Sequence, residues 1–269
     1  AGLPGTLQQV RLHVSGGFRP GWLYELVTEA EGSVVQGLGY AAVRDLLSFF
    51  RYDDGERNPL RTPDGKPVVT RVHGFGVSQS GRFLRNITYL NFNADEQNRQ
   101  VFDGVIPHVA GAGLGFFNHR FAQPTRHNGE HIDNAYPIDY FPFAYGDERD
   151  PHTGAVDGIV RRYAGDEAKF LPKIMHTQGT GEYWNRAGSL VHTDPLGTRD
   201  AEIPNDVRIY NFGGCQHSAT SYPLSRGTGD NLLNPADYNP FLRRLLLALD
   251  AWVTDGAEPP PSVYPRIDR

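Results

Sequence analysis

The sequence predicts an α/β fold in which a mostly parallel sheet is covered by helices on both faces. Two observations carry this prediction. Apolar segments of strand length alternate with segments of helical period along the chain, which is the order typical of parallel sheets. In addition, one apolar run ends in Gly76-Val77-Ser78-Gln79-Ser80-Gly81 and leads directly into a helical pattern. That layout indicates a sharp turn between a strand and a helix.

The expected strands are short apolar or alternating runs bounded by turn residues. They are Leu7–Val14, Trp22–Thr28, Val68–Val77, Phe102–Ala110, Phe170–Thr177 and Val207–Phe212. The expected helices have apolar residues three or four positions apart. Four helices are expected, beginning near Gly37, after Ser78, near Trp184 and at Asn239-Pro240. In the first, Tyr40, Val43, Leu47 and Phe50 share one face. The last is expected to end at Asp255-Gly256.

Periodicity fails between Gly113 and Asp166, where many aromatic residues stand among histidines, prolines and acids. A long irregular insertion in a compact domain is typical of a lid or a binding loop. We therefore expect one domain over residues 1–269 with a lid insertion at about 114–166. Its aromatics, which include Phe116, Phe117, Tyr140 and Phe141, are predicted to line a substrate pocket.

Composition excludes some classes of partner. The net charge of −5 and the absence of a long basic run argue against a nucleic-acid surface. No apolar run is long enough to cross a bilayer, so no membrane partner is expected. The expected partner is a small molecule. The first residues show no signal peptide, although a processed, exported protein would look the same. The compartment and the oligomeric state stay open.

Ser78 is the predicted nucleophile of the turn. A strand and a helix that meet at a sharp turn pass close together, so small residues are needed on either side of the central serine. Ser78 has Gly76 before it and Ser80 after it, whereas Ser80 would have the bulky Arg82 in the second place. The alternative is a plain Gly/Ser turn without chemistry.

A serine nucleophile needs a base, and the base needs an acid that holds its tautomer. Glu182 follows the strand that ends near Thr177, and His217 follows the strand that ends at Phe212, each in a loop rich in glycine. The order Ser78, Glu182, His217 is the one in which such triads occur on α/β sheets. Read alone, Glu182 is a solvated loop carboxylate. Asp194 and Asp206 compete for its role, but Asp206 precedes its strand and so lies at the wrong end of the sheet.

Acyl transfer also needs hydrogen-bond donors for an oxyanion. The backbone N–H of Gln79, at the start of the helix, is the first expected donor. Gly17, in the turn Gly16-Gly17-Phe18, is the second, and a simple tight turn is an equal alternative there.

Two other clusters offer different chemistry. A metal could bind among His119, His127, Glu130, His131 and Asp133, but their spacing matches no compact ligand motif, and no metal is expected. Cys215, the single cysteine, permits no internal disulfide. It stands two residues from His217, an awkward separation for a nucleophile and its base, and is expected to pack as a small apolar residue.

With these residues in view, the chain resembles a bacterial family of α/β-hydrolase-domain proteins. The resemblance is carried by five segments: Gly16–Gly21, Gly37–Asp45, Gly76–Arg85, Glu182–Arg186 with His192–Pro195, and Gln216-His217. It implies an α/β-hydrolase fold with Ser78 as nucleophile, Glu182 as acid and His217 as base. The chain is more distantly similar to glucuronoyl esterases, which have an arginine where Gln79 stands here. It resembles the interior of the longer family members, and the first strands of an eight-stranded sheet are not found before Leu7. Either the core of the sheet is reduced or the sequence is a piece of a longer protein.

The sequence therefore predicts a serine esterase that forms an acyl-enzyme on Ser78 and needs no organic cofactor. Two alternatives stay open at this stage. One is a binding module on a hydrolase scaffold with an idle serine. The other is a hydrolase that depends on a metal. The acyl and alcohol parts of the substrate are not readable from the sequence.

Overall fold

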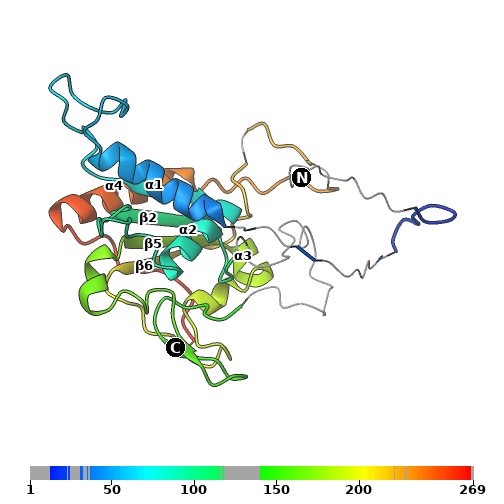
Figure 1. The fold of residues 1–269 in the computed structure, drawn as a ribbon. Helices are drawn as coiled ribbons and strands as arrows, with labels where there is room; N and C mark the ends of the chain where they lie inside the picture. Colours follow the sequence, from blue (N-terminus) through cyan, green and yellow to red (C-terminus); the bar gives the residue numbers. More distant parts are fainter. Residues whose placement is uncertain are drawn as a thin grey trace. The chain divides into compact units, whose positions relative to one another are not determined.

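The computed structural model describes residues 13–22, 24, 31–32, 35, 37–115, 117, 140–220, 222–227 and 229–267. The chain separates into two compact units, residues 1–34 and residues 35–269, and each unit is described by itself. The larger unit carries all the helices and strands described below (Figure 1). A single domain over the whole chain stays a prediction.

The centre of the larger unit is a parallel sheet of four strands in the order β1-β2-β5-β6. The strands are β1 (His73–Val77), β2 (Gly104–His108), β5 (Lys173–Gly179) and β6 (Val207–Phe212). Val77 pairs with His108, His108 with Thr177, and Gly179 with Phe212, so the carboxyl ends of the strands are aligned. Residues that follow these strands therefore meet at one edge of the sheet.

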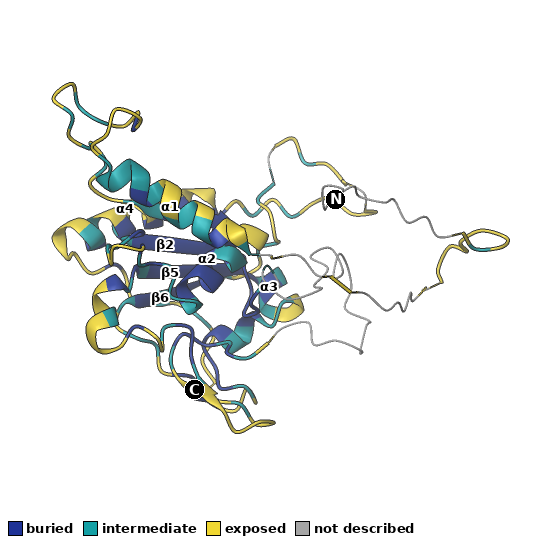
Figure 2. Ribbon diagram, viewed as in Figure 1, coloured by how far each residue is buried: buried dark blue, intermediate teal, exposed yellow. Residues whose placement is uncertain are grey.

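Helices cover both faces of this sheet, because each face carries apolar side chains. On one face, α1 (Leu38–Tyr52) and α2 (Gln79–Tyr89) contribute Tyr40 and Ile87 to a core with Val105 and Ile174 of the strands. On the other face, α4 (Asn239–Asp255) packs Leu245, Leu249 and Trp252 against Ile106, Met175 and Tyr210. Figure 2 shows the strands buried between these layers, with the outer helix surfaces exposed. The predicted α/β fold is confirmed.

Short elements complete the larger unit. They are the antiparallel pair β3 (Glu148–Arg149) and β4 (Val156–Asp157), the 3-10 turns η1 (Gly165–Phe170) and η2 (Gly188–Val191), and α3 (Thr180–Asn185). The last helix ends as its sequence predicts. Gly256 takes a left-handed conformation with φ of 67°, which a glycine adopts without steric strain at the end of a helix. Within the described residues, none of the helices is long and apolar enough to span a membrane.

Strand β6 matches its predicted run, whereas β1, β2 and β5 are shorter than theirs. The predicted strand Val68–Val77 begins only at His73. At the start of the predicted run, the Val68 N–H bonds to the Leu60 carbonyl of the preceding loop and not to a neighbouring strand. Most of the predicted strands Leu7–Val14 and Trp22–Thr28 lies outside the described residues.

The predicted lid insertion divides into two parts. Residues 118–139 lie outside the described residues. From residue 140 onward the chain contributes Tyr145, Ile159 and Tyr163, all buried, to the molecule's interior. Arg85 of α2 joins the two sides of the insertion, since its Nη2 donates to the carbonyls of Ala112 (2.9 Å) and Phe143 (2.6 Å). The described second half of the insertion therefore belongs to the packed body of the domain.

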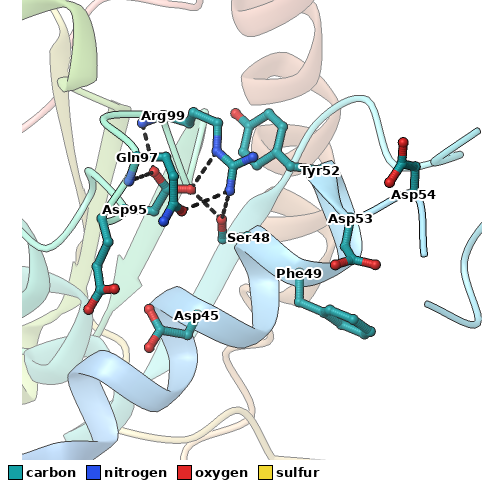
Figure 3. A pocket seen from close by; sticks show the side chains of 10 residues that line it. Asp45, Ser48, Phe49, Tyr52, Asp53, Asp54, Asp95, Gln97 and Arg99 are labelled. Atoms are coloured by element: carbon teal, nitrogen blue, oxygen red, sulfur yellow. Dashed lines mark hydrogen bonds and ion pairs between the residues drawn. The ribbon is translucent and has the colours of Figure 1, made fainter. Parts of the chain in front are cut away.

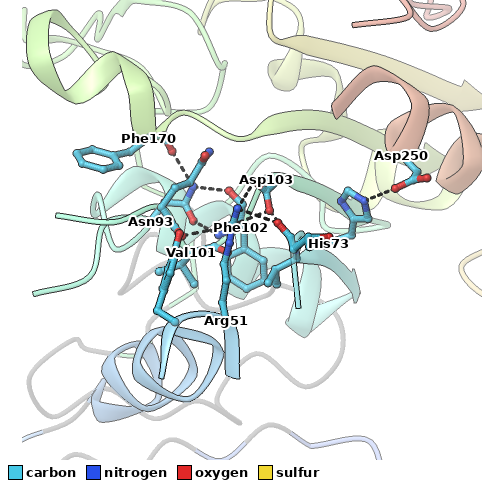
Figure 4. Close-up of polar contacts among 12 residues, drawn as sticks. Arg51, His73, Asn93, Val101, Phe102, Asp103, Phe170 and Asp250 are labelled. Atoms are coloured by element: carbon cyan, nitrogen blue, oxygen red, sulfur yellow. Dashed lines mark hydrogen bonds and ion pairs between the residues drawn. The ribbon is translucent and has the colours of Figure 1, made fainter. Parts of the chain in front are cut away.

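Polar anchors hold the loops that lead into β2 (Figure 4). The buried Asn93 side chain donates to the carbonyls of Phe102 (2.8 Å) and Phe170 (2.6 Å) and accepts from the Phe102 N–H (2.7 Å). Arg51 of α1 forms a two-pronged ion pair with Asp103, at 2.9 Å for both bonds. These contacts fix α1 and β2 relative to each other.

A pocket of about 300 Å³ opens beside α1 (Figure 3). Its polar side chains bond to one another: Asp95 accepts from Ser48 and from Arg99 Nε, the latter at 2.8 Å. Because these polar groups bond to one another, we interpret the pocket as a structural feature of the loop that contains Asp95 and Arg99.

Candidate active site

Ser78 stands at the junction of β1 and α2 with φ of 56° and ψ of −112°. A positive φ is strained for a residue with a side chain and persists only where the surroundings enforce it. Two backbone bonds enforce it here. The Ser78 N–H donates to the His108 carbonyl (2.8 Å), and the Ser78 carbonyl accepts from the Arg82 N–H (3.0 Å). The turn holds the half-buried Ser78 at the carboxyl end of β1.

Glycines allow this turn, because the strand and the helix nearly touch. A Cβ on Gly76 would lie 2.4 Å from the Ser80 carbonyl oxygen, and a Cβ on Gly81 would lie 2.9 Å from the His108 carbonyl oxygen. Ser80 is the small residue that the sequence pattern predicts after Ser78. The structure instead shows Gly81 as the residue that the close approach requires, while Ser80 lies inside α2.

Glu182 lies in the first turn of α3 and not in a loop, and it is only 2% exposed. Both of its carboxylate oxygens have partners. Oε2 accepts from the Gly179 N–H at 3.0 Å, and Oε1 accepts from Nδ1 of His217. The helix begins directly after β5, so a buried carboxylate faces the strand ends instead of solvent.

The competing carboxylates have other partners. Asp194 caps its own turn, accepting from the N–H groups of Thr198 (2.6 Å) and Arg199 (3.0 Å). Asp206 pairs with Lys173 at the amino ends of β5 and β6. Among the described residues, Glu182 is the carboxylate that contacts His217.

His217 sits in the loop after β6, and half of its side chain is exposed. The loop is tied down by the Gly214 N–H, which donates to Thr180 Oγ1 (2.8 Å), and by the Tyr238 hydroxyl, which donates to the His217 carbonyl (2.7 Å). Because a carboxylate accepts at Nδ1, the neutral imidazole has its proton on Nδ1 and its lone pair on Nε2. That tautomer is the one a general base needs.

The structure thus joins Glu182 to His217 and places Ser78 after a strand of the same parallel sheet. Among the described contacts, no hydrogen bond links the Ser78 hydroxyl with His217. Such bonds are often formed only when substrate binds. The roles of the three residues stay predictions.

Sequence reasoning missed His108, the last residue of β2. It is buried, and its Nδ1 lies 2.8 Å from Thr177 Oγ1. Burial lowers the pKa of His108 to about 4; nearby Glu182 opposes this shift and nearby His217 adds to it. The sequence signal for His108 was a titratable side chain near the end of an apolar run. In the sheet, His108 pairs with Val77, the last residue of β1.

The expected oxyanion donors differ in their surroundings. Gln79 is the first residue of α2, where N–H groups have no acceptor within the helix. The Gly17 N–H donates to the Val14 carbonyl at 2.8 Å in a tight turn of the smaller unit. Gly17 could serve an oxyanion only by giving up this bond, and its role stays a prediction.

The predicted pocket aromatics lie in different surroundings. Phe117 packs against Tyr40 and Phe83, with 6.0 Å between ring centroids in each pair. Phe141 meets Phe143 edge-on at 6.2 Å. Tyr140 is exposed, and Phe116 lies outside the described residues. Phe117 is partly buried against the core, and the role of these aromatics in a substrate pocket stays a prediction.

The alternative chemistries find no support in the described part of the chain. The cluster from His119 to Asp133 lies outside it, and no group of three metal-ligating side chains occurs within it. The Cys215 thiol is directed to the Gly213 carbonyl, and burial raises its pKa, so the thiol stays protonated. A protonated thiol is a weak nucleophile.

Comparison with known proteins agrees with this architecture. A family model described as an alpha/beta hydrolase domain matches residues 10–269, nearly the whole chain. The chain belongs to this α/β-hydrolase family, and the family indicates a hydrolase. No curated protein and no solved structure was found to match it. The more distant similarity to glucuronoyl esterases stays a prediction.

Proposed function

We propose that the protein is a serine esterase in which Ser78 is the nucleophile, His217 the general base and Glu182 the acid. The observation that carries this proposal is the bond between His217 Nδ1 and the buried Glu182 carboxylate. Ordinary loop carboxylates are solvated. A buried one, held by a backbone N–H and aimed at an exposed imidazole, is the arrangement that makes histidine a base.

In the reaction, Nε2 of His217 takes the hydroxyl proton while Ser78 Oγ attacks the ester carbonyl. Glu182 stabilises the imidazolium that forms. The Gln79 N–H, at the positive end of α2, donates to the oxyanion. The tetrahedral intermediate collapses as His217 gives its proton to the departing alcohol, which leaves an acyl group on Ser78. Water activated by His217 then releases the acid and restores the serine.

A fluorophosphonate probe tests the nucleophile without knowledge of the substrate. We expect the probe to label wild-type protein at one residue, identified as Ser78 by peptide mass spectrometry, and to leave Ser78→Ala unlabelled. Ser80→Ala is the matched control, because Ser80 lies two residues away in α2. Labelling of folded Ser78→Ala at the wild-type rate would refute the assignment, as would absence of labelling in the wild type.

A panel of aryl, alkyl and sugar-acid esters tests the reaction class. We expect turnover of at least one ester by the wild type and by Ser80→Ala, and a loss of at least about a thousandfold in Ser78→Ala. Turnover that survives in Ser78→Ala and disappears on exhaustive chelation would favour a metal-dependent hydrolase instead.

A further inference from the structure

Tyr238 contacts the main chain of the proposed base. It is only 4% exposed and directly precedes α4. Its hydroxyl donates to the carbonyl oxygen of His217 at 2.7 Å. Burial raises the pKa of the Tyr238 phenol, so the hydroxyl remains protonated and able to donate.

The Tyr238 ring is held from two strands. It stacks on Phe212, the last residue of β6, with ring centroids 5.6 Å apart and planes 3° from parallel. It also meets the His108 ring edge-on at 5.0 Å. His108 is itself fixed by Thr177 Oγ1 and by a stacked contact with Phe75 at 6.0 Å. The ends of β2 and β6 therefore define where the hydroxyl points.

The His217 loop is also anchored at Gly214, whose N–H donates to Thr180 Oγ1, and the imidazole contacts Glu182. Among the described contacts, however, only Tyr238 bonds to the main chain of His217 itself. Gln216 Nε2 donates to the Ser218 carbonyl (2.8 Å) and to Thr220, both within the same loop. The half-exposed imidazole cannot be held by burial. Tyr238 supplies a bond from the packed body of the domain to residue 217 itself.

We propose that Tyr238 is the positioning residue of the base His217, and that His108 sets the orientation of the Tyr238 ring. This inference rests on the proposed esterase function for its kinetic consequences. Tyr238 acts through His217, so its hydroxyl contributes to the chemical step and not to substrate binding. His108 thereby connects two of the candidate residues: its carbonyl accepts from the Ser78 N–H, and its ring contacts Tyr238, which bonds to His217.

The test compares Tyr238→Phe with Tyr210→Phe. The two tyrosines are matched: each is buried (4% and 6% exposed), and each donates to a backbone carbonyl at 2.7 Å, Tyr210 to that of Pro260. We expect Tyr238→Phe to lower kcat on an ester about fivefold, the value of one neutral hydrogen bond, with KM unchanged. Tyr210→Phe should retain the wild-type kcat. Equal effects in the two variants, or an effect on KM alone, would overturn the proposal.

A second measurement separates this inference from the esterase proposal. In protein labelled with ¹⁵N-histidine, the imidazole signal of His217 is identified by its absence in His217→Asn. We expect that signal to shift or broaden in Tyr238→Phe and to stay unchanged in Tyr210→Phe, whether or not the protein hydrolyses esters. An unaltered His217 signal in Tyr238→Phe would overturn the positioning role. An altered signal in a protein without esterase activity would support positioning and refute the esterase.

The role of His108 is tested by coupling. His108→Ala removes the ring that Tyr238 meets, whereas His108→Phe keeps an aromatic ring in place. We expect His108→Ala to lower kcat about as much as Tyr238→Phe, the double variant to lose little more, and His108→Phe to lose less. Losses that simply add in the double variant would refute the link. If His108→Ala does not fold, Thr177→Val tests the same link, because it frees the His108 ring; unchanged kcat there would refute it.

Discussion

Nδ1 of His217 donates a hydrogen bond to the carboxylate of Glu182, across 35 residues of sequence and between the ends of two neighbouring strands. The carboxylate is buried and the imidazole is half exposed. This asymmetry suits the proposed triad, because the carboxylate is held by the fold while the imidazole remains accessible to solvent.

Replacement of the acid tests this relationship. Glu182→Gln keeps the side-chain shape but presents a neutral amide to His217, so neither the tautomer nor the imidazolium is stabilised. We expect kcat for ester hydrolysis to fall by about a thousandfold or more. Glu148→Gln is the matched control, since Glu148 is also buried (5% exposed) but pairs with Arg199 at 2.6 Å. It should cost about 1 kcal/mol of stability and leave kcat unchanged. Similar kcat values for the two variants would contradict the role of Glu182.

The turn at Ser78 depends on Gly76. A methyl group there would overlap the Ser80 carbonyl oxygen, which belongs to the backbone and cannot move cheaply. We expect Gly76→Ala to lower the free energy of unfolding by about 3 kcal/mol, measured by urea denaturation. Gly39→Ala is the control, because Gly39 lies in α1 with open space around its Cβ position. That substitution should stabilise the protein by about 0.5–1 kcal/mol. A Gly76→Ala protein as stable as the wild type would show that the turn at Ser78 is not tightly packed.

Burial of His108 makes stability depend on pH. In the folded protein its pKa is lowered to about 4, while an unfolded histidine titrates near 6.5. The unfolded chain therefore binds the extra proton first as the pH falls. The stability that neutral His108 provides is present above pH 6.5 and is lost down to about pH 4, by roughly 3 kcal/mol. Burial lowers the pKa of His176 and His192 too, which adds to the loss. Urea denaturation at pH 7, 5.5 and 4.5 should show a shallower pH dependence in His108→Phe. An identical slope would contradict the burial of a neutral His108.

Asn93 is expected to matter for stability alone. Its side chain satisfies the N–H and carbonyl of Phe102 and the carbonyl of Phe170, and it is 1% exposed. Asn93→Ala leaves these groups unpaired, so we expect a loss of about 2–3 kcal/mol in the free energy of unfolding with KM unchanged. The exposed Asn205, changed to alanine, should shift stability by less than about 0.5 kcal/mol. Equal losses would mean that Asn93 is not an anchor.

Local patterns predicted much of this protein. The strand–turn–helix at Ser78, the strand Val207–Phe212 and the start and stop of α4 all follow from spacing and turn residues within about ten positions. The predicted α/β fold and family are confirmed. The fold was predictable because alternating strands and helices restrict the topology to few choices. Glu182 and His217 were located for the same reason: each follows a strand of a parallel sheet, and such strands end at one edge.

Tertiary structure decided what depends on contacts across the sheet. The sequence already placed Asp206 at the wrong end of the sheet, but only the three-dimensional contacts show that Glu182, and not Asp194, bonds to His217. Only the close approach of β1 and α2 reveals Gly81 as the required small residue. Residues 140–166 carried no periodic pattern, yet buried side chains such as Tyr145 and Ile159 pack into the core. Tyr238 and His108 carry no motif either, since their contacts arise from residues far apart in the chain. Sequence by itself determined the elements and the candidate chemistry. The partners of each side chain were decided by three-dimensional packing, because a contact between distant residues leaves no periodicity in the sequence.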